Sequence, residues 1–195
     1  MKTLLNTLLS LLCALFWLSL MLSFSDVQMT LMTLLAAIAH ELGHIVTMIC
    51  LKKDFLLPRS VASGFRIKSL SQSSYKEEII IAISGPLINL LFFAVFIGMS
   101  PTFAIINLVT AATNLLPMKD FDGYKIISDL ISVFFGCEAS DKIMPHLTVA
   151  VSSLFVFLSL FMIMIFNGGY WIFFIFFIVL VRQILFLQKH TFFEH

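Results

Sequence analysis

Charged residues are scarce in this chain. Of its 195 residues, Lys and Arg contribute 12 and Asp and Glu 11, so that 12% are charged, whereas 60% are hydrophobic and the mean hydropathy is +1.04. This composition excludes an ordinary soluble domain, in which about a quarter of the residues are charged. No basic tract is long enough to indicate nucleic-acid binding. We therefore expect an all-α membrane protein with no nucleic-acid partner.

Signals of disulfide chemistry and of processing are also missing. The three cysteines, Cys13, Cys50 and Cys137, lie far apart without metal or redox spacing, and their odd number gives no disulfide framework. The apolar stretch that follows Lys2 and extends to about Phe24 is longer than the roughly 7 to 15 residues of a signal-peptide core. No small-x-small cleavage site follows it, so this stretch is predicted to be a retained first span.

Six apolar runs approach the roughly 17 to 25 residues that a membrane-spanning helix needs. They lie at about 4–24, 27–51, 79–99, 101–117, 146–166 and 170–188. The fourth run is short, begins at Pro101 and contains Asn107 and Asn114, so it could be broken or surrounded by protein. We predict one polytopic domain over residues 1–195 with six transmembrane helices.

Lys and Arg are absent from every second connection between these runs, around residues 25–26, 100–101 and 167–169. The basic residues all lie on the other side: Lys2, Lys52, Lys53, Arg59, Arg66, Lys68, Lys76, Lys119, Lys125, Lys142, Arg182 and Lys189. By the positive-inside rule, both termini and the two long loops are cytoplasmic. The predicted location is the cell membrane, with several passes.

The first long loop, residues 52–78, is not uniformly polar. Phe65-Arg66-Ile67-Lys68 alternates as a half-buried strand would. We expect a short membrane-associated β-hairpin near Val61 to Leu70, whose open edge could receive an extended peptide. An amphipathic surface segment without a ligand is the alternative.

The second run contains His40-Glu41-Leu42-Gly43-His44. On a helix, residues at i and i+4 share a face, so both imidazoles and Glu41 lie within one turn, roughly 10 to 17 Å from the cytoplasmic end. Two histidines at this spacing are typical zinc ligands, with the glutamate as a general base. Ionisable groups at membrane depth indicate a functional site. We predict one zinc ion per chain.

Catalytic zinc usually has three protein ligands and an open fourth position. Candidates for the third ligand on the cytoplasmic half are Asp54, Glu77, Glu78, Asp120, Asp122, Asp129, Glu138, Asp141 and His146. Asp120 and Asp122 directly follow the fourth run, where the chain can still lie at the depth of the metal. Asp122 is slightly favoured because Gly123 suits a tight approach, but Asp120 stays open. Asp129, Glu138 and Asp141 belong to a longer, more solvated loop.

Three motifs together resemble the signatures of the site-2 proteases, which are intramembrane zinc metalloproteases. They are the histidine motif, Gly85-Pro86-Leu87-Ile88-Asn89 in the third run, and Asn114-Leu115-Leu116-Pro117 followed by Phe121-Asp122-Gly123. The compact six-span arrangement is most similar to the bacterial stage IV sporulation FB type. The resemblance covers a catalytic core of about residues 27–125.

The resemblance implies His40, His44 and Asp122 as zinc ligands and Glu41 as the catalytic base. It also implies that Asn114 helps to stabilise the oxyanion. The expected activity is hydrolysis of a peptide bond in a membrane-associated protein, near the cytoplasmic side. Regulatory membrane proteins could act on such an enzyme, but the sequence indicates neither a particular one nor an oligomeric state.

The chain departs from the family pattern in two respects. Where the family often carries further prolines, this sequence has Met118-Lys119-Asp120, which leaves a role for Asp120 at the metal open. We also expect neither a PDZ nor a CBS domain.

Proteins of other classes could carry the same metal-binding residues. A catalytically inactive membrane protein could bind metal through the same residues. A zinc transporter or sensor would favour repeated halves, and no such repeat is visible. A zinc protease of another family would need a different third ligand, for which Glu138 is the candidate in the second loop.

Overall fold

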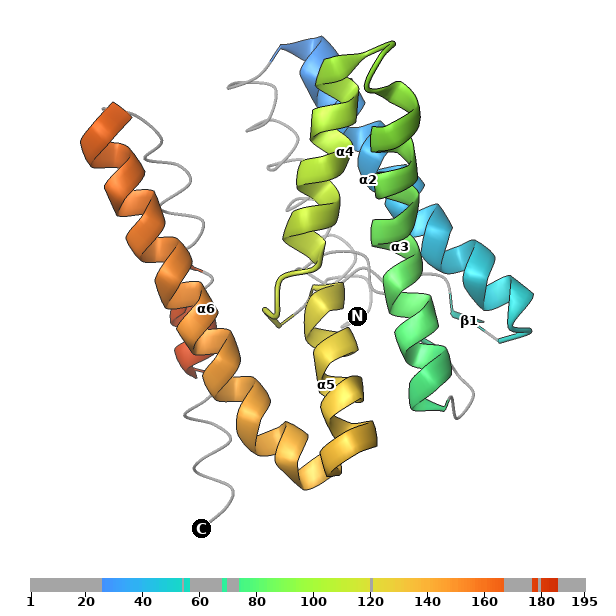
Figure 1. Ribbon diagram of the computed structural model, residues 1–195, viewed down its shortest axis with the longest axis vertical. Helices are drawn as coiled ribbons and strands as arrows, with labels where there is room; N and C mark the ends of the chain where they lie inside the picture. The colour runs from blue at the N-terminus through green and yellow to red at the C-terminus, as the bar shows by residue number, and fades with distance from the viewer. Residues whose placement is uncertain are drawn as a thin grey trace, which may run out of the picture. The chain divides into compact units, whose positions relative to one another are not determined.

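The computed structural model describes residues 26–53, 55–56, 68–69, 74–119, 121–166, 177–178 and 180–185 (Figure 1). The helices are α2 (Val27–Cys50), α3 (Tyr75–Phe96), α4 (Pro101–Asn114), α5 (Asp122–Phe135) and α6 (Cys137–Phe166). Two-residue strands, β1 (Phe55–Leu56) and β2 (Lys68–Ser69), complete these elements. The predicted all-α class is confirmed. The chain divides into two compact units, Met1–Thr113 and Asn114–His195, and each is described by itself.

Three of the described helices, α2, α3 and α6, are long and apolar enough to cross a membrane. α4 has 14 residues, about 21 Å of helix, which is less than the roughly 30 Å hydrocarbon core of a bilayer. The run at 4–24 lies outside the described residues, and the run at 170–188 is described only in part. The count of six spans therefore stays a prediction.

α2 shows an inverted surface pattern, with small residues inside and large apolar residues outside. Ala36 and Ala39 are buried, whereas Leu35, Ile38 and Leu42 are each more than half exposed. In a soluble protein such an exposed apolar face would be unfavourable, but lipid accepts it. This face therefore fits the bilayer predicted from the composition.

α2 and α3 approach each other closely where their glycines meet. A Cβ atom on Gly43 would lie 2.7 Å from the Ser84 carbonyl oxygen and 3.1 Å from the Gly85 Cα. Small residues permit this close approach of two backbones. The crossing brings the face of α2 that carries His40 and His44 against α3.

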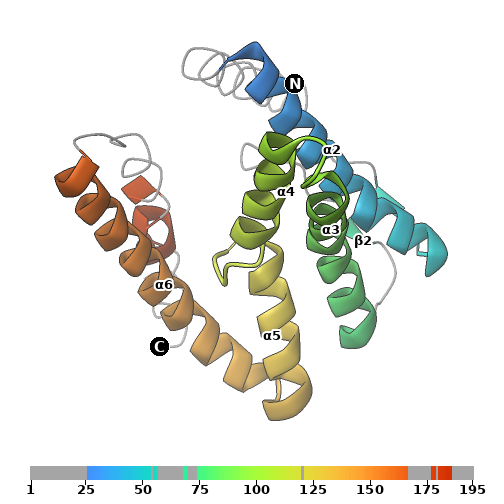
Figure 2. The same ribbon diagram turned by 45° about the horizontal axis from the view of Figure 1, so that its top comes forward.

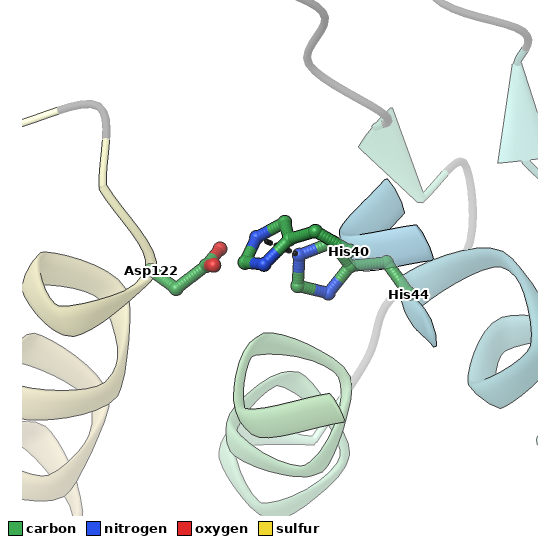
Figure 3. Close-up of side chains that lie close together, drawn as sticks. All are labelled: His40, His44 and Asp122. Atoms are coloured by element: carbon green, nitrogen blue, oxygen red, sulfur yellow. Dashed lines mark hydrogen bonds between the residues drawn. The ribbon is translucent and has the colours of Figure 1, made fainter. Parts of the chain in front are cut away.

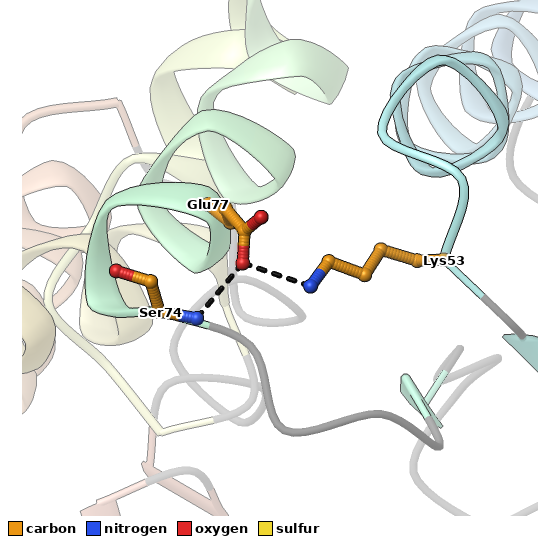
Figure 4. Close-up of polar contacts among 3 residues, drawn as sticks. All are labelled: Lys53, Ser74 and Glu77. Atoms are coloured by element: carbon orange, nitrogen blue, oxygen red, sulfur yellow. Dashed lines mark hydrogen bonds and ion pairs between the residues drawn. The ribbon is translucent and has the colours of Figure 1, made fainter.

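The ends of the first long loop are joined by an ion pair (Figure 4). Lys53 Nζ lies 2.8 Å from Glu77 Oε2, and the same oxygen accepts a hydrogen bond of 2.9 Å from the Ser74 backbone N–H. Ser74 and Glu77 form a capping box that starts α3. The ion pair thus joins the chain just after α2 to the first turn of α3.

Within that loop, β1 and β2 pair antiparallel, with Phe55 opposite Ser69 and Leu56 opposite Lys68. Most of the segment in which the hairpin is expected, Val61 to Leu70, lies outside the described residues. The hairpin and its substrate-pairing edge therefore stay predictions.

Three phenylalanine rings pack α4 against the end of α3, and Figure 2 shows the two helices side by side. The ring centroid of Phe103 lies 5.2 Å from that of Phe96 and 6.2 Å from that of Phe92. Aromatic pairs at these separations are favourable beyond the area they bury. They hold α4 beside α3.

In the second unit, α5 and α6 form a helical hairpin (Figure 1). α5 ends at Phe135, and the capping residue Gly136 has a φ of +87° that residues with side chains rarely adopt. The Ser140 hydroxyl on α6 donates to the Ser128 carbonyl on α5 at 3.0 Å. The expectation of a long loop before a fifth span at 146–166 was wrong: this connection is largely helical, and α6 begins at Cys137. A criterion based on long apolar runs misses α5 because that helix is short and amphipathic.

Candidate metal centre

The two histidines of α2 face each other one helical turn apart (Figure 3). His40 and His44 are 5% and 9% exposed. Their Nε2 atoms lie 3.2 Å apart, and the rings stand nearly perpendicular, at 84°. The predicted pairing of the two imidazoles is therefore present.

The other nitrogen of each ring is held by an oxygen from α3. His40 Nδ1 lies 2.7 Å from Asn89 Oδ1, and His44 Nδ1 lies 2.7 Å from the Ile81 carbonyl oxygen. Because these oxygens accept hydrogen bonds, each Nδ1 carries the proton and donates it. Each neutral ring therefore presents an unprotonated Nε2.

This arrangement directs two nitrogen lone pairs toward the same point. A hydrogen bond between the Nε2 atoms would need a second proton on one ring, which would make a buried imidazolium. A metal cation resolves the conflict without that proton. Tetrahedral zinc with nitrogens at 2.0–2.1 Å sets its ligand nitrogens roughly 3.3 Å apart, and the observed separation is 3.2 Å. The histidine pair thus fits zinc, including its outer-shell hydrogen bonds.

Gly85 of α3 lies directly against the two rings. A Cβ atom there would overlap the His44 ring and lie 2.8 Å from His40 Nε2. Any side chain at this position would enter the space between the histidines. The glycine of the second motif therefore has a steric role at the candidate centre.

Glu41 follows His40 on α2 and is partly buried. This position puts a carboxyl group in the same helical turn as both candidate ligands, as the spacing predicted. In the first unit, the structure thus brings together three of the five predicted site residues.

The other two, Asn114 and Asp122, belong to the second unit. Asn114 is the last residue of α4, and Asp122 is the first residue of α5, as Figure 3 shows for Asp122. Both side chains are partly buried. The segment between them turns back on itself, with a hydrogen bond of 3.0 Å from the Phe121 N–H to the Met118 carbonyl.

Close packing holds this segment in place. A Cβ atom on Gly123 would overlap the carbonyl of Leu115 and lie 2.6 Å from the Leu116 oxygen. The Thr148 hydroxyl of α6 donates to the Pro117 carbonyl at 3.0 Å, and Met118 is fully buried. The tight approach expected at Gly123 is confirmed, and it explains why a glycine follows Asp122.

Several other candidate ligands have different surroundings. Glu77 pairs with Lys53, and His146 is exposed with its Nδ1 2.9 Å from the Lys142 carbonyl. Glu138 and Asp141 are exposed near the start of α6. Asp54 and Asp120 lie outside the described residues, so the choice between Asp120 and Asp122 is left to experiment.

Sequence reasoning missed the groups that hold the rings. The position of Asn89 near Pro86 suggests only a partner for a helix kink, although an amide in an apolar span is itself a signal. The Ile81 carbonyl belongs to the main chain, which leaves no mark in the sequence.

Solved structures include chains that are similar to this one. No protein-family model matches the chain, and no curated protein sequence matches it. Among solved structures, the chain is similar to the site-2 protease from Methanocaldococcus jannaschii, with a TM-score of 0.61 and 18% identical residues. The match covers 90% of this chain and 86% of that chain. At this identity the likeness shows a shared fold.

Proposed function

We propose that this protein is an intramembrane zinc metalloprotease of the site-2 protease type. The observation that carries the proposal is the convergence of His40 Nε2 and His44 Nε2, 3.2 Å apart, with both Nδ1 atoms held by oxygens of α3. The shared fold with a site-2 protease supports the proposal. The three sequence motifs support it independently.

His40, His44 and Asp122 would hold the zinc ion. They supply two imidazole nitrogens and one carboxylate oxygen, a set that could hold a metal ion and that matches the usual composition of catalytic zinc sites. The juxtaposition of the start of α5 with the histidine turn of α2 is part of this proposal. One zinc ion per chain is expected.

When bound, zinc would supply a Lewis acid that lowers the pKa of a water ligand towards 7 and polarises a peptide carbonyl. Glu41 would accept a proton from the attacking water and later donate it to the departing amine. The Asn114 amide would donate a hydrogen bond to the developing oxyanion.

The proposed substrate is a membrane-associated protein whose helix unwinds locally, because a helical backbone shields its carbonyl groups from attack. Cleavage would occur near the cytoplasmic side of a multi-pass cell-membrane protein with both termini in the cytoplasm. Regulatory membrane proteins could control access to the site.

The test combines zinc content with cleavage by the full chain in liposomes. The probe is a tagged single-span protein with helix-breaking residues near the cytoplasmic end of its span. Glu41→Gln should bind one zinc ion per chain and lose cleavage, whereas Glu138→Gln, at an exposed site, should keep both. Normal cleavage by Glu41→Gln would refute the role of Glu41 as base. Zinc binding by the parent chain without cleavage, in that assay, would favour an inactive metal-binding protein.

The same assay decides the third ligand. Asp122→Ala should lose zinc, and Asp120→Ala should retain it. Loss of zinc in Asp120→Ala alone would transfer the ligand role to Asp120. Retention of zinc in both variants would remove the start of α5 from the centre.

A further inference from the structure

The two histidines differ in the kind of oxygen that holds Nδ1. His44 meets the Ile81 main-chain carbonyl, which can only accept a hydrogen bond. His40 meets the side-chain amide of Asn89, which can present either its oxygen or its NH₂ group. The protonation of His40 Nδ1 therefore depends on which way that amide points.

Two further oxygens set the orientation of the Asn89 amide. Asn89 Nδ2 donates to the Ala36 carbonyl at 3.0 Å and to Asn107 Oδ1 at 2.8 Å. A reversed amide would place its own oxygen against both of these acceptors. The amide of Asn107 is oriented in turn, because its Nδ2 donates to the Phe103 carbonyl at 2.8 Å.

The hydrogen bonds that lead from Asn107 through Asn89 to His40 form a relay, and burial makes each partner in it hard to replace. Asn89 and Asn107 are both 0% exposed, so bulk water cannot readily replace a lost partner. A buried amide proton without an acceptor carries a desolvation cost. If the Asn89 amide reversed, it would donate to His40 Nδ1, and the imidazole proton would move to Nε2. That tautomer cannot bind a metal through Nε2.

We propose that Asn107, on α4, is a positioning residue for His40. Acting through Asn89, it fixes the tautomer in which Nδ1 is protonated and Nε2 is ready to bind metal. The inference rests on the proposed function in that it takes His40 as a zinc ligand. Asn107 belongs to none of the three motifs that predicted the centre. Its only sequence signal is an amide in an apolar run.

The expected effect follows from the hydrogen-bond acceptor that a substitution at Asn107 removes. Changing an outer-shell partner typically lowers metal affinity about 10- to 100-fold. Asn107→Leu removes one of the two oxygens that orient Asn89 and leaves the Ala36 carbonyl. We therefore expect a zinc affinity about tenfold below that of the parent chain, at the lower end of this range.

The experiment uses the full chain in detergent, with two measurements. Zinc affinity is measured by competition with a chelator, and histidine tautomers are measured by ¹⁵N NMR of the metal-free protein. The His40 signal is assigned by its absence from His40→Gln. Asn107→Leu should lose affinity and show an increased share of the Nε2-protonated form, whereas Asn107→Asp, which keeps an oxygen acceptor, should stay closer to the parent in both measurements.

Thr113→Val is the matched control on the same helix, because that exposed hydroxyl donates to carbonyls of its own helix, those of Val109 and Thr110. If Asn107→Leu does not fold, the experiment uses Asn107→Ala instead, because that variant also lacks the side-chain oxygen. Parental affinity and tautomer in the folded variant would overturn the proposal, as would equal losses in the Leu and Asp variants. If the parent binds no zinc, the proposed function fails, but the metal-free tautomers still test the relay.

Discussion

Two regions of this protein hold the proposed zinc ligands in different ways. At the crossing of α2 and α3, His40 and His44 are oriented by hydrogen bonds that their rings donate to the Asn89 side-chain oxygen and to the Ile81 carbonyl. At the start of α5, Asp122 is placed by the path of the main chain, where Gly123 packs on the carbonyl of Leu115. The first region orients side chains, and the second positions a backbone.

This difference predicts that substitutions in the two regions lower different quantities, metal affinity in one and stability in the other. A ring that is pushed can rotate at a cost of about 0.5–1.5 kcal/mol, so damage at the crossing should appear mainly as lost metal affinity. A displaced backbone forces its neighbours to move, and overpacking costs about 1–3 kcal/mol or more. Damage at the start of α5 should therefore appear first as lost stability.

The largest effect is expected from Gly123→Ala. The added Cβ atom would overlap the Leu115 carbonyl and lie 2.6 Å from the Leu116 oxygen, both of which belong to the main chain. Because neither can rotate away, we expect a destabilisation of about 3 kcal/mol or more. Thermal unfolding of the purified chain in detergent measures it.

Gly98→Ala is the control for this change. Among the residues that the structure describes, a Cβ atom at Gly98 would meet nothing within 4 Å, so the melting temperature should match that of the parent. If Gly123→Ala melts no lower than Gly98→Ala, the backbone at the start of α5 is not tightly packed.

Gly85→Ala should lower zinc affinity more than stability, which is the opposite of the effect expected from Gly123→Ala. Its Cβ atom would enter the space between the histidines, 2.8 Å from His40 Nε2, and the rings would have to turn away from Asn89 and Ile81. We expect zinc affinity to fall at least about tenfold, as for other changes to groups that orient ligands, with a smaller loss of stability than in Gly123→Ala. Chelator competition and thermal unfolding on the same samples give both values. A variant that melts early yet binds zinc normally would contradict the proposed distinction.

The features visible in the sequence are those carried by side-chain pattern. The second span is predicted at 27–51 and α2 covers Val27–Cys50, because the apolar run is bounded by Asp26 and by Lys52. The one-turn spacing of His40 and His44 follows from helical periodicity alone. The approach at Gly123 could be anticipated because glycine is suited to close contacts.

The features that escaped prediction depend on the main chain or on long-range pairing. The Ile81 carbonyl is shared by every residue type, so no sequence pattern marks its bond to His44. The Asn89–Asn107 pair joins two helices, and its register depends on how α3 and α4 pack. α5 escapes a criterion based on long apolar runs, because this helix has 14 residues.

The smallest effect is expected from Thr148→Val, which probes how α6 supports the segment before α5. The substitution keeps the shape of the side chain but removes the hydroxyl, whose single proton is shared between the Pro117 carbonyl at 3.0 Å and the Met144 carbonyl of its own helix at 2.8 Å. One net hydrogen bond contributes about 1 kcal/mol, so we expect a modest decrease in melting temperature. Ser153→Ala is the control, since that exposed hydroxyl donates to the Val149 carbonyl of its own helix. Equal melting temperatures for the two variants would mean that Pro117 gains nothing from Thr148, and that packing around Met118 and Gly123 alone positions Asp122.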